Sequence, residues 1–562
     1  MVYTTIEKEG NIMNKKIKRN LGYFLILMLS VAVILLFVYT LNKNPKQLKV
    51  QNDIESKILE KLADKEFSFE NPMVVQDPYG TNSLSAIIVF KSYGSSYINV
   101  TIKGKGGAED YAYTMEKYSG DDEILSIPVV GLYANHLNIV EVAYGDQIKT
   151  FEIKTAKLPD NLFSTVVETS TPSLMHGGFT FVPRFGNSLA AFDSHGEVRF
   201  YSNYFHGRMV RELNNGNMLV YGPNAKTDLK KTLSRLYEID SLGKIYNTYF
   251  VNDSIHHDYW ELENGNLILT VDGNSTVKQI AAKVLSKIKI NIELKKEQVL
   301  VEVGKNSKIV NTWDMEDVVG YMPNNNYDLE HDWFHLNAVI VDPKDDTFIV
   351  SSRHQNFLLK FSKDKNVSWI MGDHTNPNFT EEHKDLLLTP IGDDFEWQYG
   401  QHAPEIVKRD GDDLYLIVFD NGNMRSFDKN QYVLPKDNYS RVVLYKIDEK
   451  AMTIEQLFEY GKDRGSELFS SYVGDVDVLG KNHYLFSFTG VAYDADKNVT
   501  SKDYAECDTC GDYVFTGGSV IEYKDGEVIY EIKTNFKQNS GVMTYRAERL
   551  FLENSINNFK LD

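Results

Sequence analysis

Three segments of the sequence place histidines near the start of an apolar strand pattern. They are IHHD (255–258), HLN (335–337) and QHA (401–403). Alternate side chains of a strand point to the same face, so His335 and Asn337 share one face. Aligned on their apolar positions, the segments put His256, His335 and His402 in equivalent places. One such histidine is more often structural, but three in equivalent places predict a common site.

Two further residues extend this candidate site. His257 directly follows His256 and has the opposite parity, but a bulge in the strand would exchange the two, so both stay candidates. Arg353 falls in the strand expected after the HLN segment and could reach the same site, with His354 facing away from it. The predicted cluster therefore combines imidazoles with the guanidinium of Arg353 and the amide of Asn337.

Such a cluster suits two kinds of chemistry. Metal sites favour histidine with carboxylates, and a guanidinium would be repelled by a cation, so we expect no metal, although Asp258 keeps a metal site open. Guanidinium and amide groups instead donate hydrogen bonds to the oxygens of a tetrahedral oxyanion. The sequence has no G-x-x-x-x-G-K-[ST] loop, so nucleotide-phosphate binding of that type is not supported.

The strands that carry these residues belong to a repeated pattern. Six copies of a predicted hairpin span 190–202, 234–250, 299–315, 357–373, 442–461 and 519–532. An inner strand pair precedes most copies, and two of these pairs, RELNNGNMLVYG (211–222) and ELENGNLILTVDG (261–273), match at a 49-residue offset. Four strands per unit at a spacing of ~40–50 residues are the sequence signature of a propeller blade.

We therefore predict an all-β chain in which residues 157–562 form a six-bladed β-propeller. The innermost strand of each blade lines the central channel, so the histidines would point toward one axis. Uneven spacing of the copies indicates insertions at 277–298 and 374–400, over one face of the ring.

The chain before the repeats divides into four parts. Residues 66–156 alternate apolar and polar positions in short bursts, which predicts a small antiparallel β-sandwich. Residues 42–65 are expected to be a linker. Residues 21–41 are uncharged and follow a basic stretch within residues 1–20, which predicts a single transmembrane helix, a cytoplasmic N-terminus and later domains outside the cytoplasm. The alternative is a cleaved signal peptide, which would give a secreted protein.

The composition limits which partners the protein can bind and what its cysteines can do. The 562-residue chain has a formal net charge of −19, which argues against nucleic acid as a partner because nucleic-acid binding needs clustered Lys and Arg. Its two cysteines, Cys507 and Cys510, are too few for a four-cysteine zinc site. We expect them to form a small disulfide in a loop outside the cytoplasm.

With these motifs, the sequence resembles the bacterial arylsulfate sulfotransferases, which are extracytoplasmic six-bladed propellers with a small N-terminal β-domain. The resemblance covers roughly residues 66–562. It rests on HHD (256–258), HLN (335–337), Arg353, QHAPE (401–405), FDNGN (419–423) and YRAER (545–549). The predicted anchor and the position of the cysteine pair depart from the family's better-known members.

The resemblance implies transfer of a sulfuryl group from an aryl sulfate donor to a phenolic acceptor, with no cofactor, metal or nucleotide donor. His402 matches the nucleophile of the family, which forms a sulfohistidine. Arg353, His335 and Asn337 would hold the sulfuryl oxygens. His256 or His257 would act first as acid and then as base. The residues implied to line the cleft are Thr489 and Tyr545.

Two other functions stay open at this point. A propeller without catalytic activity could bind a phenolic or sulfated ligand or a cell-surface partner, since a fold alone implies no chemistry. An arylsulfate hydrolase would share the first chemical step and pass the group to water. Formation of a homodimer through the N-terminal domain is also left open.

Overall fold

The structure is a computed structural model that describes residues 46–561, except 93–95, 118–123, 161–163, 185–187, 224, 227–231, 252–253, 274–296, 324–331, 502–514, 536–543 and 558. The predicted transmembrane segment (21–41), the basic stretch before it, Cys507 and Cys510 lie outside the described residues, as does most of the predicted insertion at 277–298. Among the described residues, no helix combines the length and apolar character needed to cross a bilayer.

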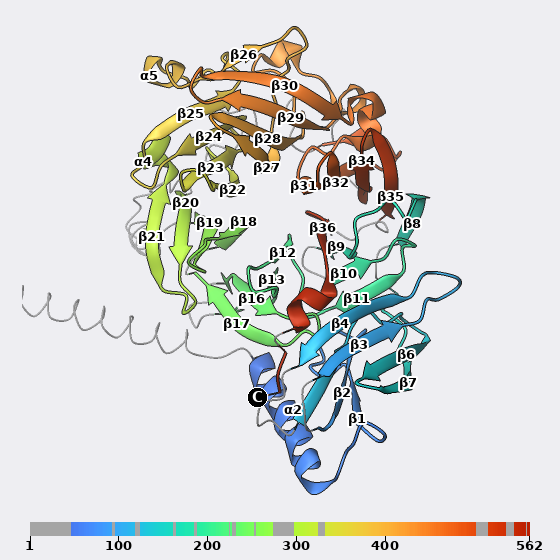
Figure 1. Cartoon of the computed structure of the whole chain (residues 1–562). Coiled ribbons are helices and arrows are strands. Elements are labelled where there is room, and N and C mark those ends of the chain that lie inside the picture. Colours follow the sequence, from blue (N-terminus) through green and yellow to red (C-terminus); the bar gives the residue numbers. More distant parts are fainter. Residues whose placement is uncertain are drawn as a thin grey trace, which may run out of the picture.

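Most described residues after position 164 form six sheets that stand in a ring, as the blades of a propeller do (Figure 1). From the centre outward, the first three sheets are β36 (Glu548–Leu550), β9 (Phe179–Arg184), β10 (Ser188–Phe192) and β11 (Val198–Ser202); β12 (Val210–Glu212), β13 (Met218–Tyr221), β16 (Arg235–Ile239) and β17 (Ile245–Phe250); and β18 (Ser254–Glu261), β19 (Leu267–Gly273), β20 (Glu297–Val303) and β21 (Ile309–Asp314).

The other three sheets follow in the same order around the ring. They are β22 (Leu336–Asp342), β23 (Thr347–Ser352), β24 (Phe357–Phe361) and β25 (Val367–Gly372); β27 (His402–Asp410), β28 (Asp413–Asp420), β29 (Arg441–Asp448), β30 (Thr453–Tyr460) and β26 (Thr389–Ile391); and β31 (Asp475–Gly480), β32 (His483–Tyr493), β34 (Phe515–Lys524), β35 (Glu527–Asn535) and β8 (Ser164–Ser170). The short strand β33 (Val499–Thr500) pairs with β32, and β14 (Ala225–Lys226) pairs with β15 (Thr232–Leu233).

Short helices occur in the connections between strands and, in the case of η4, after the last strand. They are α4 (Met315–Val319), α5 (Glu381–Lys384) and the 3-10 helices η1 (Lys429–Gln431), η2 (Pro435–Asp437), η3 (Lys462–Leu468) and η4 (Leu552–Ile556). Helix α5 and strand β26 lie in the predicted insertion 374–400, where β26 adds a parallel edge strand to β30. This insertion therefore widens one blade at its outer edge.

All six predicted hairpins are confirmed, and each forms the third and fourth strands of a blade. The pairs are β10–β11, β16–β17, β20–β21, β24–β25, β29–β30 and β34–β35. Three of the second strands, β9, β13 and β23, are buried at every position. They read as continuous apolar runs because both of their faces pack against neighbouring blades.

The ring is closed by strands from both ends of the propeller sequence. Strand β8, the first of this region, pairs with β35 at the outer edge of the last sheet. Strand β36, near the C-terminus, pairs with β9 and becomes the innermost strand of the first sheet. The two pairings hold the first and last blades together by main-chain hydrogen bonds.

The N-terminal domain is a sandwich of two antiparallel sheets. One contains β1 (Met73–Gln76), β2 (Ala86–Lys91) and β5 (Ile124–Val129); the other contains β4 (Tyr111–Lys117), β3 (Ser96–Ile102), β6 (Leu137–Tyr144) and β7 (Gln147–Lys154). It packs against the first two blades (Figure 1). Side-chain hydrogen bonds from Thr81 and Asn82 to the carbonyls of Gly243 and Ser241 fix this contact.

The segment expected to be a linker contains helix α2 (Lys46–Asp64). The helix packs on the second blade, where Gln51 exchanges two hydrogen bonds with the main chain of Ile245 and Glu55 forms a buried ion pair with Lys244 (2.9 Å). Its apolar side chains, Ile58 and Leu62, are spaced four apart and face the N-terminal domain core. The polar composition of this segment led to the prediction of a linker. One face of the helix nevertheless packs against the rest of the protein, largely through polar contacts.

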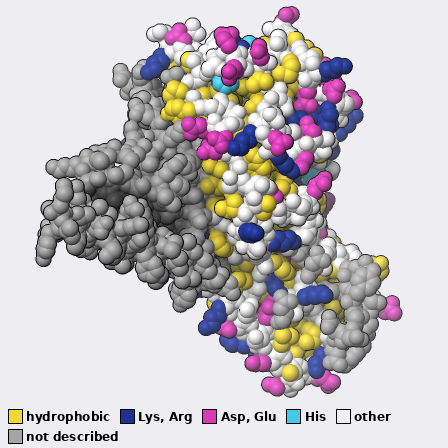
Figure 2. All heavy atoms as spheres, turned by 90° about the vertical axis from the view of Figure 1, so that its left-hand side faces the viewer, with side chains coloured by type: hydrophobic (Ala, Val, Ile, Leu, Met, Phe, Trp, Pro, Cys, Tyr) yellow, Lys and Arg dark blue, Asp and Glu magenta, His cyan; other side chains and the backbone are white. Residues whose placement is uncertain are grey.

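The outer surface carries no single dominant charge on the side that Figure 2 presents. Acidic and basic side chains are interspersed there with neutral and hydrophobic ones over the described residues.

Candidate active site

The three inner strands that contain or directly follow the predicted histidines are irregular near those positions. The pairing register shifts within Ile255–Tyr259 of β18, within Leu336–Ala338 of β22 and within His402–Glu405 of β27. The backbone φ is positive at His257 (71°), His335 (52°) and Ala403 (44°). Bulges of this kind redirect side chains and are concentrated at functional sites. Simple strand alternation therefore does not describe which histidines meet.

His402 is buried at the start of β27 and is held in one tautomer. Its Nδ1 lies 2.7 Å from Oδ1 of Asn421 and 3.1 Å from the carbonyl oxygen of Gly400. The Asn421 amide is itself oriented, because its Nδ2 donates to the carbonyls of Ser470 and Val473 at 2.6 and 2.7 Å. Both partners of Nδ1 are acceptors, so Nδ1 carries the proton and Nε2 keeps its lone pair.

The environment also keeps this imidazole neutral. Burial lowers the pKa of His402 to about 3, and the nearby guanidinium of Arg353 acts in the same direction. An imidazole with this pKa is uncharged throughout the neutral range. His402 thus presents an unprotonated nitrogen without needing a base to remove a proton.

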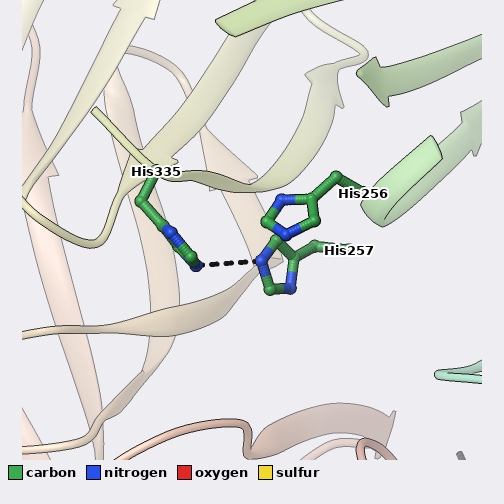
Figure 3. Close-up of side chains that lie close together, drawn as sticks. All are labelled: His256, His257 and His335. Atoms are coloured by element: carbon green, nitrogen blue, oxygen red, sulfur yellow. Dashed lines mark hydrogen bonds between the residues drawn. The ribbon is translucent and has the colours of Figure 1, made fainter. Parts of the chain in front are cut away.

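His257 and His335 belong to a chain of hydrogen-bonded side chains (Figure 3). The hydroxyl of Tyr545 is hydrogen-bonded to Nδ1 of His257, and Nε2 of His257 lies 2.9 Å from Nε2 of His335. Nδ1 of His335 lies 2.6 Å from a carboxylate oxygen of Asp332. Since the carboxylate accepts, a consistent arrangement has Tyr545 donating to His257 and His257 donating to His335. An added proton on His335 would reverse these donors without moving a heavy atom.

The structure separates the two adjacent histidines that the sequence left open. His257 lies in this chain, and its ring centre is 6.2 Å from that of His402. Burial lowers the pKa of His257 well below its usual value, and the positive charge of neighbouring groups adds to the effect. His256 lies beside His257, with ring centres 3.6 Å apart, and its Nε2 is 3.9 Å from a carboxylate oxygen of Asp272.

Arg353 lies in the turn that follows β23. Its guanidinium donates from Nη1 to Nε2 of His354 (3.1 Å) and from Nη2 to the carbonyl of Ser471 (3.0 Å). The prediction that His354 faces away from Arg353 is therefore wrong. The ring of His354 also stacks on His335, with centres 4.4 Å apart, and its Nδ1 binds the carbonyl of Asp332. The tight turn after β23, which departs from strand alternation, brings the two neighbouring side chains together.

Asn337 and Thr489 are both buried near the same residues. Nδ2 of Asn337 donates to the carbonyl of Gln401 at 2.7 Å, directly before His402. The hydroxyl of Thr489 lies 3.5 Å from the carbonyl of Tyr545. In this structure the two side chains therefore hold the backbone that carries His402 and Tyr545.

Asp258, the carboxylate for which metal binding stayed possible, instead forms hydrogen bonds and an ion pair within the protein. One carboxylate oxygen accepts from the main-chain N–H of Val339 (3.1 Å), and the other lies 3.2 Å from Nη1 of Arg546. It thus links β18 to β22 and to the C-terminal segment. The ring nitrogens of His256, His257 and His335 approach within 4.8 Å of one another, close enough to share a metal ion, but the Nε2 atoms of His257 and His335 are paired with each other.

Sequence reasoning missed three residues of the site. Asn421 lay within the FDNGN motif without a role, and Asp332 was not connected to His335. Arg208, whose guanidinium lies 5.9 Å from the ring centre of Tyr545 and lowers the pKa of His257, was not considered. The repeat offset was a signal for it, because Arg208 precedes His257 by the same 49 residues that separate the matching hairpins.

Two family models match the chain. The model described as Arylsulfotransferase (ASST) covers residues 164–546, and the model described as Arylsulfotransferase Ig-like domain covers residues 73–158. The first match spans the ring of sheets through Arg546, and the second spans the N-terminal sandwich. Both parts of the chain are thus similar to parts of one kind of protein.

Curated relatives resemble the chain over most of its length. Arylsulfate sulfotransferase AssT of Lelliottia amnigena is 25% identical over 539 residues, covering 74% of this chain and 84% of the relative. The AssT of Escherichia coli O6:H1 (strain CFT073) is 25% identical over 529 residues, with the same coverage of 74% and 84%.

Solved structures give weaker likenesses. A virginiamycin B lyase from Staphylococcus aureus is 9% identical, with a TM-score of 0.30 over 67% of this chain and 100% of that chain. The periplasmic gluconolactonase of Pseudomonas aeruginosa is 10% identical, with a TM-score of 0.29 over 63% and 81%. Likenesses at this level support no conclusion about activity.

Proposed function

This chain belongs to the arylsulfotransferase (ASST) family, and we propose that it transfers a sulfuryl group from a phenolic sulfate ester to a phenol through a sulfohistidine at His402. The observation that carries the proposal is the fixed tautomer of His402, whose Nδ1 donates to Asn421 and Gly400. A neutral imidazole with an available lone pair is a competent nucleophile near neutral pH.

In the first half-reaction, Nε2 of His402 forms a bond to sulfur while the bond from sulfur to the phenolic oxygen breaks. The oxygen leaves with the bonding electrons and requires a proton. The substituted imidazole becomes cationic and retains its proton on Nδ1, where the oxygens of Asn421 and Gly400 stabilise the positive charge. In the second half-reaction, a phenol gives up its proton, attacks sulfur and releases His402.

The proton for the leaving oxygen passes from His335 through His257 to the hydroxyl of Tyr545. The carboxylate of Asp332 accepts from Nδ1 of His335 and so lies where it can balance a positive charge on that imidazole during the transfer. His257, neutral because of its lowered pKa, accepts the proton at Nε2 and releases one from Nδ1 to the hydroxyl of Tyr545, which donates its own proton to the leaving oxygen. The same chain takes up the proton of the incoming phenol in the second half-reaction.

Arg353 stabilises the transferred group. Sulfuryl transfer resembles phosphoryl transfer, in which a loose transition state spreads negative charge over the equatorial oxygens. A guanidinium held on two sides by His354 and the carbonyl of Ser471 is oriented before the substrate arrives. Asn337 supports the reaction by fixing the backbone at Gln401. Thr489 acts likewise on Tyr545.

We extend the proposal to the location of the protein. The uncharged segment 21–41 anchors the chain in the cell membrane with the catalytic domain outside the cytoplasm, or is cleaved to release it. The donor and acceptor are then small phenolic compounds from outside the cytoplasm.

The test uses the full-length protein, an aryl sulfate with a chromogenic leaving group and a phenol acceptor, with neither nucleotide nor metal added. Colour release that increases with phenol concentration, with parallel initial-rate plots for donor and acceptor, supports the transferase and its ping-pong order. Release at a rate independent of phenol would instead identify a hydrolase. No release with several donors would contradict both and favour a binding protein.

A further inference from the structure

A second cluster of chemistry-bearing side chains lies further along the inner strands than the histidines. Asp475 and Asp477 are on β31, Glu548 is on β36, and Glu405 follows His402 by three positions on β27. Carboxylate oxygens of Asp475, Asp477 and Glu548 lie within 4.8 Å of one another. The proposed sulfuryl transfer uses none of these carboxyl groups.

The cluster lines a cavity of about 320 Å³. Asp475 is 2% exposed, and its Oδ2 accepts no hydrogen bond from the residues that the structure describes. Oδ2 of Asp477 is likewise without a hydrogen bond from the described part of the chain. Buried carboxylate oxygens almost always have a partner, because leaving them without one costs free energy. These oxygens therefore indicate a ligand that the protein itself does not supply.

The charges around the cavity point to the sign of that ligand. Seven carboxyl groups line the cavity, but only two guanidinium groups, those of Arg211 and Arg546, do so. Both guanidiniums lie close to one carboxylate, that of Asp258, at 3.8 and 3.2 Å. The two guanidiniums also offset part of the charge on Asp475 and Glu548, and Nε of Arg546 lies 3.6 Å from Asp475. Seven carboxyl groups nevertheless outnumber two guanidiniums in the lining, so the excess favours a cation.

We propose that Asp475, Asp477 and Glu548 bind a calcium ion in this cavity, with Glu405 at its edge. Calcium takes oxygen ligands at 2.3–2.6 Å, so two ligands on opposite sides are about 4.6–5.2 Å apart. The carboxylate oxygens of the three residues all lie within 4.8 Å of one another, which is close enough for one ion to contact all three. Magnesium demands near-ideal octahedral geometry and usually retains several waters, so three clustered protein carboxylates suit calcium better.

The ion would stabilise the closure of the ring. Glu548 belongs to β36, the C-terminal strand that completes the first blade, whereas Asp475 and Asp477 belong to the last blade. A shared ion would join these two blades at the centre, where the main-chain pairing of β8 with β35 joins them at the periphery. Calcium is thus proposed as a structural ion, separate from the transfer reaction.

Protons compete with calcium for the carboxylate oxygens of this cluster. Burial raises the pKa of Asp475 and of Glu548, and the mutual repulsion of the carboxylates adds to the rise. The experiment therefore includes a pH at which protons compete less.

The test titrates the full-length protein, depleted of metal with EDTA and then freed of EDTA, with CaCl₂ at pH 7.5 and pH 9.0. We expect one calcium per chain by isothermal titration calorimetry and an increase in Tm of roughly 5 °C at saturation. Magnesium chloride at the same concentration should produce a smaller increase. Absence of calcium binding at both pH values would overturn the proposal and leave protonated carboxyl groups as the explanation.

Two variants and one control locate the ion. Asp477→Asn and Glu548→Gln remove a ligand charge at nearly constant size, and both should lose the calcium-dependent rise in Tm. Glu381→Gln, a substitution on an exposed helix with 89% side-chain exposure, should retain it. A rise that persists in both site variants would place the ion elsewhere and contradict the assignment. If either variant does not fold, calorimetry on the other variant and on the unmodified chain decides whether the cluster binds calcium.

Discussion

Two neighbouring blades contain nearly the same inner hairpin and differ in what precedes it. The turns of RELNNGN (211–217) and WELENGN (260–266) match residue for residue at most positions. The pairing of β12 with β13 is regular throughout, whereas the pairing of β18 with β19 is interrupted where the histidines occur. Where one blade has His257, the position 49 residues earlier has Arg208. The two blades thus share the inner hairpin and differ in the residues at or just before the start of the inner strand.

This comparison indicates how the site is built. Three bulged inner strands aim imidazoles at one another, while the regular blade contributes a guanidinium from the same position. The functional difference between the blades should therefore appear as a difference in role. We propose that His257 moves a proton and that Arg208 contributes charge only.

The largest effect is expected for His402, the proposed nucleophile. His402→Ala should lower turnover by more than about 10³-fold, because no covalent intermediate can form. The fold should persist, since one side chain is a small part of the core. Steady-state rates and circular dichroism of the purified variant check both statements, and near-normal activity would remove His402 as nucleophile.

Arg353→Ala should reduce kcat by about 10²–10³-fold, as the loss of a preorganised oxyanion donor does. The control is Arg409→Ala, a half-buried arginine whose ion pair with Glu449 (2.7 Å) lies outside the described site. We expect that control to change stability more than kcat. An unchanged rate in Arg353→Ala would exclude this guanidinium from the reaction.

His257→Ala tests the proton-transfer role and should depend on the leaving group. With a phenyl sulfate donor, whose leaving oxygen is strongly basic, we expect a loss of about 10²-fold or more. With 4-nitrophenyl sulfate the loss should be much smaller, because that phenolate needs little help from an acid. Equal losses with the two donors would contradict a proton-transfer role.

Arg208→Ala tests the role of the residue that the other blade contributes at the equivalent position. Its guanidinium acts through charge, so we expect a loss of about 10-fold that is similar for both donors. Arg208→Lys should recover much of the rate, since it keeps the charge. A strong dependence of Arg208→Ala on the leaving group would mean that the two blades do not divide the roles as described.

The smallest effect concerns stability rather than rate. In the unfolded chain His402 takes up a proton below about pH 6.5, whereas in the folded chain its pKa is about 3. The unfolded state binds more protons in this window, so His402 costs stability as pH falls from 7 toward 3. Between pH 7 and pH 5, wild type should lose about 2 kcal/mol more free energy of unfolding than His402→Gln.

Urea unfolding of both proteins at these two pH values measures that difference. The other buried histidines, such as His354, are present in both proteins and cancel in the comparison. Parallel losses in the two proteins would mean that His402 titrates normally in the folded chain.

Much of the fold could be predicted from the sequence because hairpins leave local signals. The six outer hairpins follow from apolar runs around turns. The closure of the ring could not be predicted, because β8 and β36 pair with strands hundreds of residues away. Helix α2 was missed because its contacts, such as Glu55 with Lys244, are polar and distant in sequence.

The sequence predicted which residues belong to the site better than it predicted how they are arranged. Equivalent positions in repeats correctly indicated that histidines from three blades meet. Strand parity favoured His256, however, and the bulge in β18 placed His257 in the hydrogen-bonded chain instead. Bulges and tight turns depend on tertiary packing, so the roles of His354 and Asn421 were visible only in three dimensions.

The most direct test of the account is to look for the covalent intermediate. The full-length protein is mixed with an aryl sulfate in the absence of phenol, quenched within one turnover and digested at neutral to alkaline pH for mass spectrometry. We predict one sulfuryl group per chain, on the peptide that contains His402, which disappears when phenol is added before the quench. A burst of released phenol without sulfation of His402, or sulfation of another residue, would contradict the account.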